Sequence, residues 1–419
     1  MIPNEATMKY ALVHANDDVC QLALRGCDNP LVDMHLALQQ IQGRQIARVK
    51  LPSWANNDNI VYPPRLSLEQ CSSQATAQYK QTVVHDLLMF DSQNDSLKID
   101  NRKTVNGKIL DLTGGFGVDF AFMSQAFSQA TYVERREDLC EVAKHNFTVL
   151  GLKGIIVVCA DGIEYLQSLD GTVDMIFVDP ARRDSQGSRT YGISDCTPDV
   201  IPLMELLLRK SRFVMLKLSP MLDWRKAVAD LGEHNVQQVH IVAVAGECKE
   251  LLVILSAENS DMSVRLVCVN DDSREVFMLN TSPQPTLSTT SSLHTTTLAS
   301  SLFLYEPNAA LMKAGLFTEL AERYGVMLLA VNSHLFLSAN AVPHFPGRRF
   351  VIEAVSTMNK RDLRQYIIPL QQANISVRNF PMSVAELRHR LKLSEGGSKY
   401  IFATTLATGE RMLLICSKA

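Results

Sequence analysis

The chain has 419 residues and a mass of 46.6 kDa, with 46% hydrophobic and 20% charged residues, which is too long for one compact core. This composition is ordinary for a globular protein and excludes a chain that is disordered or collagen-like throughout. The formal net charge is −3, but residues 340–400 hold ten Lys and Arg against four Asp and Glu. Such uneven charge permits an anionic partner at one end of the chain.

Cysteine, histidine and apolar patterns exclude further classes. The nine cysteines include no Cys-x-x-Cys pair, so neither a disulfide framework nor a structural zinc site is expected. The ten histidines show no metal-ligand spacing, and we expect no metal. No apolar run is long enough to span a bilayer, and the N-terminus lacks the pattern of a signal peptide. We therefore expect a cytoplasmic protein without a membrane partner.

The N-terminal part of the sequence predicts helices. Apolar residues recur at three-to-four spacing over residues 5–50, and a second helix is expected over residues 67–88. A polar connection lies between them, and residues 91–106 have the composition of a loop or linker. The pattern indicates a helical N-terminal domain over residues 1–95.

From Lys108 onward, strand-like apolar runs alternate with helical segments, which favours an α/β fold with a parallel, doubly wound sheet over residues 96–275. Only a short loop separates the last two runs, so we expect an antiparallel hairpin at the sheet edge. The expected strands are residues 109–112, 130–133, 155–159, 175–178, 213–218, 239–244 and 251–255.

The C-terminal part follows a Ser/Thr-rich connection at residues 282–300, which is typical of a domain boundary. A helix is expected over residues 308–324, and short strands and helices then alternate in the manner of a small α+β domain. These further elements are expected at residues 349–355, 360–371, 376–379, 383–391 and 400–405.

A glycine-rich turn follows the first strand. Asp111 ends the strand, and Gly115 and Gly117 allow the backbone to approach a ligand at the carboxyl edge of the sheet. The dinucleotide fingerprint is not met, because Phe120 occupies its third glycine position. A carboxylate at Asp111 suits an ammonium group better than a pyrophosphate, which points to S-adenosylmethionine (SAM). A purely structural turn is the alternative.

Acids also end the next two strands. Glu134 follows the second strand, and its carboxylate can accept hydrogen bonds from both hydroxyls of a ribose. Asp161, before Gly162, can accept from an adenine amine, and it can equally cap the helix that follows. Solvated acids at strand ends are the alternative for both.

The fourth strand ends in Asp179 and Pro180, followed closely by Arg182 and Arg183. Proline restricts the backbone, and such a turn can hold a substrate amine or base against a methyl donor. The two arginines can clamp a phosphate, although surface ion pairs explain them as well.

Together these four strand ends resemble the class I SAM-dependent methyltransferases over residues of about 105–256. The resemblance implies a Rossmann-like sheet of seven strands with the last one antiparallel, and SAM as cofactor. It gives catalytic roles to Asp179, Pro180 and Arg182. The residues expected to bind the cofactor are Asp111, Thr113, Gly115, Gly117, Glu134, Arg135, Asp161 and Gly162.

A closer resemblance covers most of the chain. The segments at residues 50–55, 62–73, 179–183, 246–250 and 305–308 are similar to a bacterial methyltransferase family with a THUMP-like C-terminal domain. The resemblance implies a ferredoxin-like segment over residues 276–340 and a THUMP-like domain over residues 341–419. Since THUMP domains occur on RNA-modifying enzymes, it also implies an RNA partner, such as tRNA or rRNA.

Methylation of a base nitrogen is favoured over covalent C5 chemistry, because the fifth strand ends in Lys217-Leu-Ser-Pro without a cysteine. Cys248, beside Lys249, is either an activated thiol or a buried inert one, and we favour the inert thiol. A small-molecule or protein methyltransferase and a non-catalytic RNA-binding protein remain alternatives. Residues 72–80 are also a candidate lid over the cofactor, or an ordinary packing helix. We expect Arg183 and Lys217 at the strand ends, and Arg348 and Arg349 in the C-terminal module, to bind substrate. In that module, Arg348 and Arg349 belong to a phosphate-binding surface, or a solvated helix face, that also includes Lys360, Arg361, Arg364, Arg378, Arg388, Arg390, Lys392 and Lys399.

Overall fold

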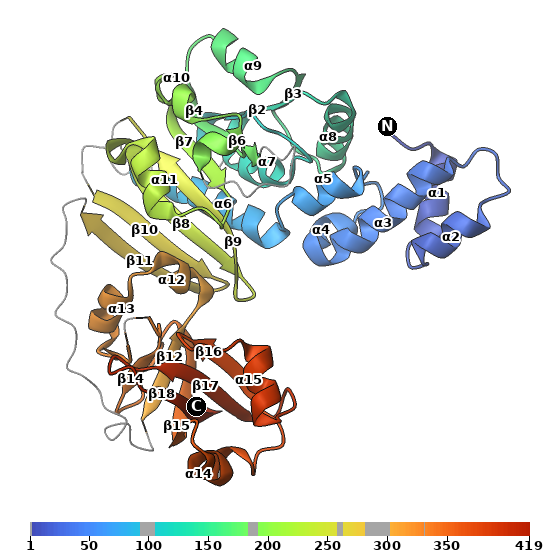
Figure 1. The fold of residues 1–419 in the computed structure, drawn as a ribbon. Coiled ribbons are helices and arrows are strands. Elements are labelled where there is room, and N and C mark those ends of the chain that lie inside the picture. Colours follow the sequence, from blue (N-terminus) through green and yellow to red (C-terminus); the bar gives the residue numbers. More distant parts are fainter. Residues whose placement is uncertain (1, 93–104, 183–191, 258–262, 281–301, 331) are drawn as a thin grey trace. The chain divides into compact units, whose positions relative to one another are not determined.

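The computed structural model describes residues 2–92, 105–182, 192–257, 263–280, 302–330 and 332–419 (Figure 1). The chain divides into two compact units. The first, here called the N-terminal unit, comprises Met1–Val244, Lys249–Leu266 and Met278–Thr281, and the C-terminal unit comprises Ala245–Cys248, Val267–Phe277 and Ser282–Ala419. Within the described ranges, no helix is both long and apolar enough to cross a membrane.

The N-terminal unit begins with helices, as predicted, but the helix expected over residues 67–88 is interrupted. The break falls at Cys71–Ser73, where the Ser73 hydroxyl accepts a hydrogen bond from the Thr76 N–H at 3.3 Å and so starts a new helix. The helices are α1 (Glu5–Val13), α2 (Val19–Arg25), α3 (Met34–Lys50), α4 (Pro52–Ala55), α5 (Arg65–Gln70) and α6 (Gln74–Ser92).

All seven predicted strands form, in the order β3-β2-β1-β4-β7-β9-β8. The pairs β1–β2, β2–β3, β1–β4 and β4–β7 are parallel, and β7–β9 is antiparallel. Their bounds are β1 (Val105–Asp111), β2 (Phe127–Glu134), β3 (Ile155–Cys159), β4 (Val173–Val178), β7 (Ser211–Leu218), β8 (Val236–Val244) and β9 (Glu247–Leu255).

The predicted position of the hairpin at the sheet edge is wrong. Strands β8 and β9 are consecutive neighbours, but β10 (Ser263–Asn270) and β11 (Ser273–Asn280) continue the sheet beyond β8. The reason is that the alternating residues of β10 bury Val264, Leu266 and Cys268, so this second hairpin completes the sheet instead of leaving β8 exposed.

Helices and short elements connect the strands of the N-terminal unit. Helix α8 packs on β2 and β3, and α10 packs on β7. The helices are α7 (Val118–Met123), α8 (Glu137–Val149), α9 (Gly162–Ser168), α10 (Met204–Lys210) and α11 (Trp224–Leu231), with the short turns η1 (Ser124–Ala126), η2 (Ile193–Asp195), η3 (Ile201–Leu203) and η4 (Glu233–Asn235) and the two-stranded ribbon β5 (Ala181–Arg182) with β6 (Cys196–Thr197).

The C-terminal unit contains a second sheet, in the order β13-β14-β12-β15-β18-β17-β16. The helix expected over residues 308–324 is two helices, because Gly315 takes a left-handed conformation (φ 67°) and ends the first. The elements are β12 (Phe303–Pro307), α12 (Ala309–Ala314), α13 (Phe317–Tyr324), β13 (Met327–Leu328), β14 (Phe336–Ser338), β15 (Gly347–Ser356), α14 (Lys360–Asp362), the π-helical turn η6 (Leu363–Ile367), β16 (Asn374–Arg378), α15 (Val384–Leu391), β17 (Lys399–Thr405) and β18 (Arg411–Lys418).

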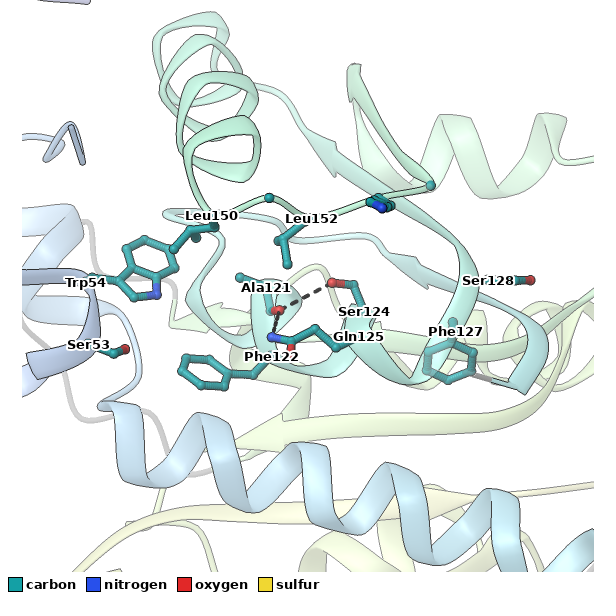
Figure 2. A pocket seen from close by; sticks show the side chains of 13 residues that line it. Ser53, Trp54, Ala121, Phe122, Ser124, Gln125, Phe127, Ser128, Leu150 and Leu152 are labelled. Carbon is teal, nitrogen blue, oxygen red and sulfur yellow. Dashed lines mark hydrogen bonds between the residues drawn. The ribbon is translucent and has the colours of Figure 1, made fainter. Parts of the chain in front are cut away.

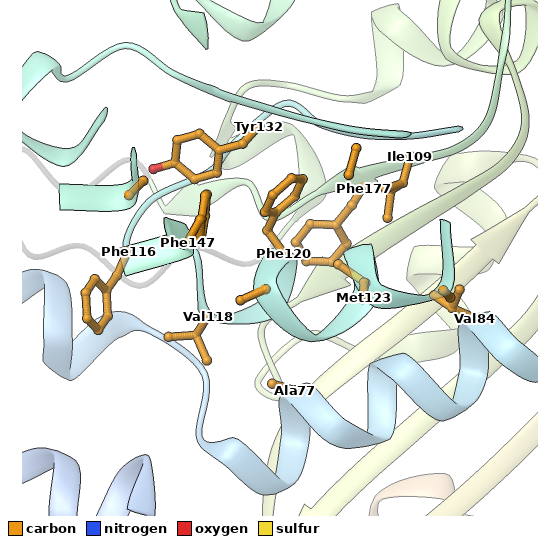
Figure 3. Packing of buried hydrophobic residues seen from close by; sticks show 14 of the residues in the cluster. Ala77, Val84, Ile109, Phe116, Val118, Phe120, Met123, Tyr132, Phe147 and Phe177 are labelled. Atoms are coloured by element: carbon orange, nitrogen blue, oxygen red, sulfur yellow. The ribbon is translucent and has the colours of Figure 1, made fainter. Parts of the chain in front are cut away.

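An aromatic core supports the turn between β1 and α7 (Figure 3). The ring of Phe120 is fully buried and lies 5.5 Å from Tyr132 and 5.2 Å from Phe147, measured between ring centroids. Aromatic pairs at such distances stabilise beyond the area that they bury. Phe120 therefore fills the core at the position where a dinucleotide-binding turn has its third glycine.

Candidate active site

The glycines of the β1–α7 turn are needed for two different reasons. A Cβ on Gly114 would lie 2.2 Å from the Tyr132 ring, and a Cβ on Gly117 would lie 2.7 Å from Phe147. Both glycines thus let the turn pack onto the aromatic core. Gly115, by contrast, has only a distant neighbour at its Cβ position, but its φ of 57° disfavours other residues. The space beside Gly115, on the side where a Cβ would lie, is therefore not filled by other side chains of the turn.

Asp111, at the end of β1, is a buried acid with one unused oxygen. Its side chain is 1% exposed, and Oδ1 accepts hydrogen bonds from the Thr113 N–H at 2.9 Å and the Thr113 hydroxyl at 3.4 Å. Oδ2 accepts none from any residue that the structure describes. Burial raises the pKa of Asp111 to about 8, against the opposing effect of the Thr113 hydrogen bonds. A nearby cation would restore the ionised form.

Glu134 at the end of β2 accepts two backbone hydrogen bonds. Its Oε2 accepts from the Gly115 N–H and its Oε1 from the Arg136 N–H, each at 2.9 Å. The carboxylate thus joins the glycine-rich turn to the start of α8. Arg135, which we expected to bind the cofactor, is exposed beside it.

Asp161 caps helix α9, as the alternative interpretation proposed. Its Oδ1 accepts from the N–H groups of Ile163 at 2.8 Å and Glu164 at 3.2 Å. Gly162 is required at this point, because a Cβ there would lie 2.1 Å from the carbonyl oxygen of Leu112. The chain after β3 thus packs directly on the backbone that follows β1.

Asp179, at the end of β4, joins the turn through Thr113. The Asp179 N–H donates to the Thr113 hydroxyl at 2.7 Å, and that hydroxyl also contacts Asp111. Lys217 Nζ donates to Asp179 Oδ2 at 2.5 Å. The side chain of Asp179 remains 37% exposed, and its Oδ1 accepts no hydrogen bond from the described residues. One oxygen of this acid is therefore held while the other is available.

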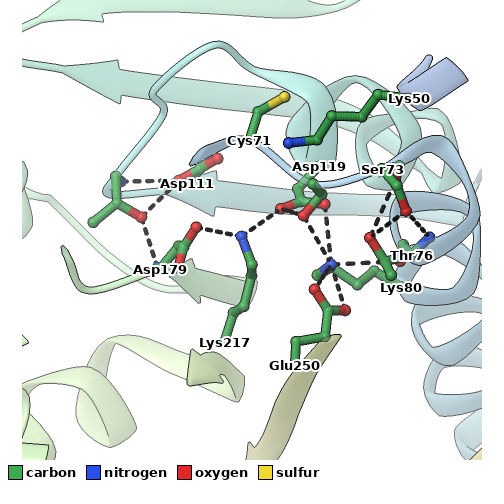
Figure 4. A network of polar contacts seen from close by, with 12 residues as sticks. Lys50, Cys71, Ser73, Thr76, Lys80, Asp111, Asp119, Asp179, Lys217 and Glu250 are labelled. Atoms are coloured by element: carbon green, nitrogen blue, oxygen red, sulfur yellow. Dashed lines mark hydrogen bonds and ion pairs between the residues drawn. The ribbon is translucent and has the colours of Figure 1, made fainter. Parts of the chain in front are cut away.

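A chain of buried charges extends from Asp179 to helix α6 (Figure 4). Lys217 also lies 3.4 Å from Asp119 Oδ2, and Asp119 Oδ1 lies 3.1 Å from Lys80 Nζ. Lys80 is completely buried, and its Nζ lies 2.6 Å from Glu250 Oε1. Burial alone would lower the pKa of Lys217, but the carboxylates of Asp179 and Asp119 raise it above its usual value. Lys217 therefore remains charged.

Residues 72–80, the candidate lid, are fixed by this cluster. The hydroxyl of Ser72 donates to Asp119 Oδ2 at 2.7 Å, while Lys80 Nζ contacts that hydroxyl at 3.3 Å. Ser72, Lys80 and Asp119 are all less than 10% exposed. The segment is thus packed against α7, directly behind the glycine-rich turn.

The other predicted site residues are divided between the two units, and one falls outside the described ranges. Pro180 is buried, Arg182 lies in β5 opposite Cys196, and Arg183 falls outside the described residues. Arg348 and Arg349 belong to β15 of the C-terminal unit. Lys217, which we expected to bind substrate, contacts the carboxylates of Asp179 and Asp119. Among the described residues, no three His, Cys, Asp or Glu are grouped to hold a metal.

A hollow of about 550 Å³ lies elsewhere in the N-terminal unit (Figure 2). Its lining includes Phe127 and Ser128 at the start of β2 and Gly154 just before β3. In a parallel sheet these positions lie at the edge opposite to the strand ends that carry Asp111 and Asp179. The hollow is consequently separate from the candidate active site.

The strand order, with β9 antiparallel and acids at the ends of β1, β2 and β4, defines the class I methyltransferase fold. Residues 303–346 match a ferredoxin-like domain family, and residues 347–418 match a THUMP domain-like family. The chain is 34% identical to the solved structure of a "putative methyltransferase" from Porphyromonas gingivalis W83, with 100% of both chains covered and a TM-score of 0.81. The chain belongs to this methyltransferase family, and the predicted family and fold class are confirmed.

Two other solved structures are similar at lower scores. The structure of a "putative methyltransferase" from Streptococcus mutans, in complex with SAH, is 12% identical over 36% of this chain and 89% of that one, with a TM-score of 0.28. The structure of a "putative RNA methyltransferase" from Pyrococcus horikoshii is 14% identical over 46% of this chain and 89% of that one, with a TM-score of 0.33. Neither enters the assignment of the family. No curated protein matches the sequence.

Sequence reasoning missed the cluster of Lys80, Asp119 and Glu250: it offered Glu250 only as a possible substrate contact or a solvated turn residue, whereas Glu250 is buried against Lys80. Lys80 lies inside a helix, and its 170-residue separation from Glu250 leaves no local pattern. Asp119 was visible in the glycine-rich segment, where an acid at the second position of a helix is usually explained by the helix dipole. Only the folded chain brings the three together.

Proposed function

We propose that this chain transfers the methyl group of SAM to a nitrogen of an RNA base, with Asp179 holding the base and the C-terminal unit binding the RNA. The observation that carries the proposal is the Asp111–Thr113–Asp179 arrangement, in which two acids at neighbouring strand ends each keep one oxygen free of described partners. One acid suits the ammonium of SAM and the other suits the N–H of a base.

The residues present fit the cofactor. Asp111 Oδ2 is an unused acceptor of a buried acid, which a cation would compensate. Each oxygen of Glu134 accepts one backbone hydrogen bond and keeps a second lone pair that can accept from a ribose hydroxyl, and the open side of Gly115 leaves room for close approach. SAM supplies an electrophilic methyl group, so the protein needs mainly to align the nucleophile with it.

Asp179 and Lys217 would perform that alignment. Lys217 fixes Oδ2, so Oδ1 is left to accept a hydrogen bond from an amino or ring N–H of the base. Pro180 restricts the backbone that follows, which limits the orientations open to the carboxylate. An RNA substrate is supported by the THUMP domain-like match at residues 347–418 and by the basic charge of residues 340–400.

The test is methyl transfer from labelled SAM to RNA extracted from a strain without the gene, followed by mass spectrometry of the nucleosides. We expect one methylated nucleoside to appear with the wild type. Asp179→Asn should bind SAM within about twofold of the wild type and lose methyl transfer, since the amide presents a donor where a base N–H needs an acceptor.

The alternatives predict other results. Binding of SAM without any labelled RNA would favour a small-molecule or protein substrate. If the wild type binds RNA but calorimetry detects no binding of SAM, the protein is a non-catalytic RNA-binding protein. Asp179→Asn with wild-type turnover would remove Asp179 from the catalytic role.

A further inference from the structure

A buried carboxylate in the C-terminal unit holds two arginines that are distant in sequence. Glu306, near the end of β12, has a side chain only 4% exposed. Arg348 of β15 donates to Glu306 Oε2 through Nε at 2.7 Å and also through Nη2. Arg378, the last residue of β16, donates through Nη2 to Oε1 at 2.6 Å. Both oxygens of Glu306 are thus occupied by guanidinium groups.

The charges of this trio do not balance. A buried carboxylate is compensated by one cation, yet Glu306 faces two guanidinium groups, which are always charged. The surplus is one positive charge. His334, which lies near Arg378, does not add to it at neutral pH, because burial and Arg378 lower its pKa.

The two guanidinium groups are fixed but still reach solvent. The side chain of Arg348 is 51% exposed and that of Arg378 is 33% exposed. The guanidinium of Arg348 also lies 5.5 Å from the centroid of the Phe350 ring, a distance typical of a cation–π contact. Each arginine has five N–H donors, and Glu306 takes only some of them.

We propose that Arg348 and Arg378, positioned by Glu306, form a phosphate-binding site for the backbone of RNA. Arginine binds phosphate through paired N–H groups, and immobilising the guanidinium beforehand reduces the entropy lost on binding. This site gives the Tyr305-Glu-Pro-Asn308 segment a ligand-directed role: its acid orients the cations that contact RNA. The inference depends on the RNA substrate of the proposed function and assigns where that RNA is held.

The experiment measures binding of a fluorescently labelled RNA hairpin to the full chain by anisotropy, over a series of salt concentrations. Arg348→Gln and Arg378→Gln should each reduce the slope of log K against log salt by about 0.9, the value for one lost phosphate contact. The double variant should lose about twice as much. Arg209→Gln removes the same charge from an exposed side chain on α10 of the N-terminal unit and should keep the wild-type slope.

Circular dichroism separates binding from folding. Folded Gln variants that retain the wild-type slope would overturn the phosphate-binding site and leave the arginines as counterions of Glu306. The methyl-transfer assay tests the proposed function independently of this result. Where a Gln variant does not fold, Arg348→Lys and Arg378→Lys keep the charge but lose the paired donors. These variants should keep the slope and bind more weakly, and unchanged affinity in both would reject the proposal.

Discussion

Asp111 combines two properties that oppose each other. A buried carboxylate is unfavourable in its ionised form, and among the residues that the structure describes only Thr113 donates a hydrogen bond to it. The pKa of about 8 follows from that burial. A group that titrates near neutral pH in the absence of a cation is suited to bind one, because the ligand supplies the missing charge.

The affinity for SAM should therefore depend on pH through Asp111. Below pH 8 most of the carboxyl groups are protonated, so binding of an ammonium must release a proton, and affinity should rise toward pH 8 by up to about tenfold per pH unit. Calorimetry between pH 6 and pH 8 measures this effect. Asp111→Asn is the matched control and should show weaker, flatter binding; an equal pH dependence in both proteins would contradict the assignment.

Asp111 should also make the protein less stable as pH rises from the acidic to the neutral range. Since its pKa is raised in the folded state, the folded protein binds a proton that the unfolded chain releases, and stability is lost as pH rises from about 4 to about 8. Asp111→Asn keeps an acceptor for Thr113 and removes the charge. We expect its unfolding free energy at pH 8 to exceed that of the wild type by more than about 1 kcal/mol.

Urea unfolding at several pH values tests this prediction. The difference between variant and wild type should grow with pH and become small near pH 4. A constant difference would mean that the substitution acts through packing or hydrogen bonding, without any contribution from ionisation.

At the scale of elements, the fully buried ammonium group of Lys80 links helix α6 to the sheet through an ion pair with Glu250. Lys80 contacts Asp119 of α7 and Glu250 of β9, and all three side chains are buried. The apolar face of α6 packs on the same region through Ala77 and Val84 (Figure 3). A buried cation between two acids fixes one orientation of α6 against α7, the helix that begins directly after the glycine-rich turn.

Lys80→Met should consequently destabilise the protein by about 3–5 kcal/mol, because it leaves buried carboxylates without their partner. The double variant Lys80→Met/Glu250→Gln removes one of those orphaned charges and should recover part of the loss. Thermal or urea unfolding of both variants provides the measurement. A double variant no more stable than the single one would show that Lys80 acts through its packing alone.

The sequence predicted the elements that have a local apolar periodicity. It did not predict features that depend on contacts between residues distant in the sequence. The seven strands of the first sheet and the acids at Asp111, Glu134 and Asp179 follow from apolar runs that end in polar turns. The break at Ser73 and the end of α12 at Gly315 were missed, since apolar periodicity continues across both. The Lys217–Asp179 pair joins strand ends 38 residues apart, which periodicity cannot reveal.

At the scale of the whole molecule, charge is divided unevenly along the chain. Residues 340–400 have an excess of six positive charges, although the protein as a whole is at −3. Several of these cations are engaged within the C-terminal unit: Lys399 pairs with Glu353 at 2.5 Å, and Arg348 and Arg378 pair with Glu306. The net positive charge nevertheless remains, because the acids are fewer than the bases.

This division predicts different salt responses for the two ligands. RNA binding to the full chain should weaken steeply with salt, with a log–log slope of about −2 or steeper, because each phosphate contact releases counterions. In the proposed site, SAM would be held by buried or backbone-bonded acids such as Asp111 and Glu134, which salt screens less, so its affinity should change less than about twofold over the same range. Anisotropy with an RNA hairpin and calorimetry with SAM in the same buffers compare the two directly. RNA binding that is absent or insensitive to salt would instead favour a small-molecule or protein substrate, since a folded polycationic surface cannot bind phosphates without displacing their ions.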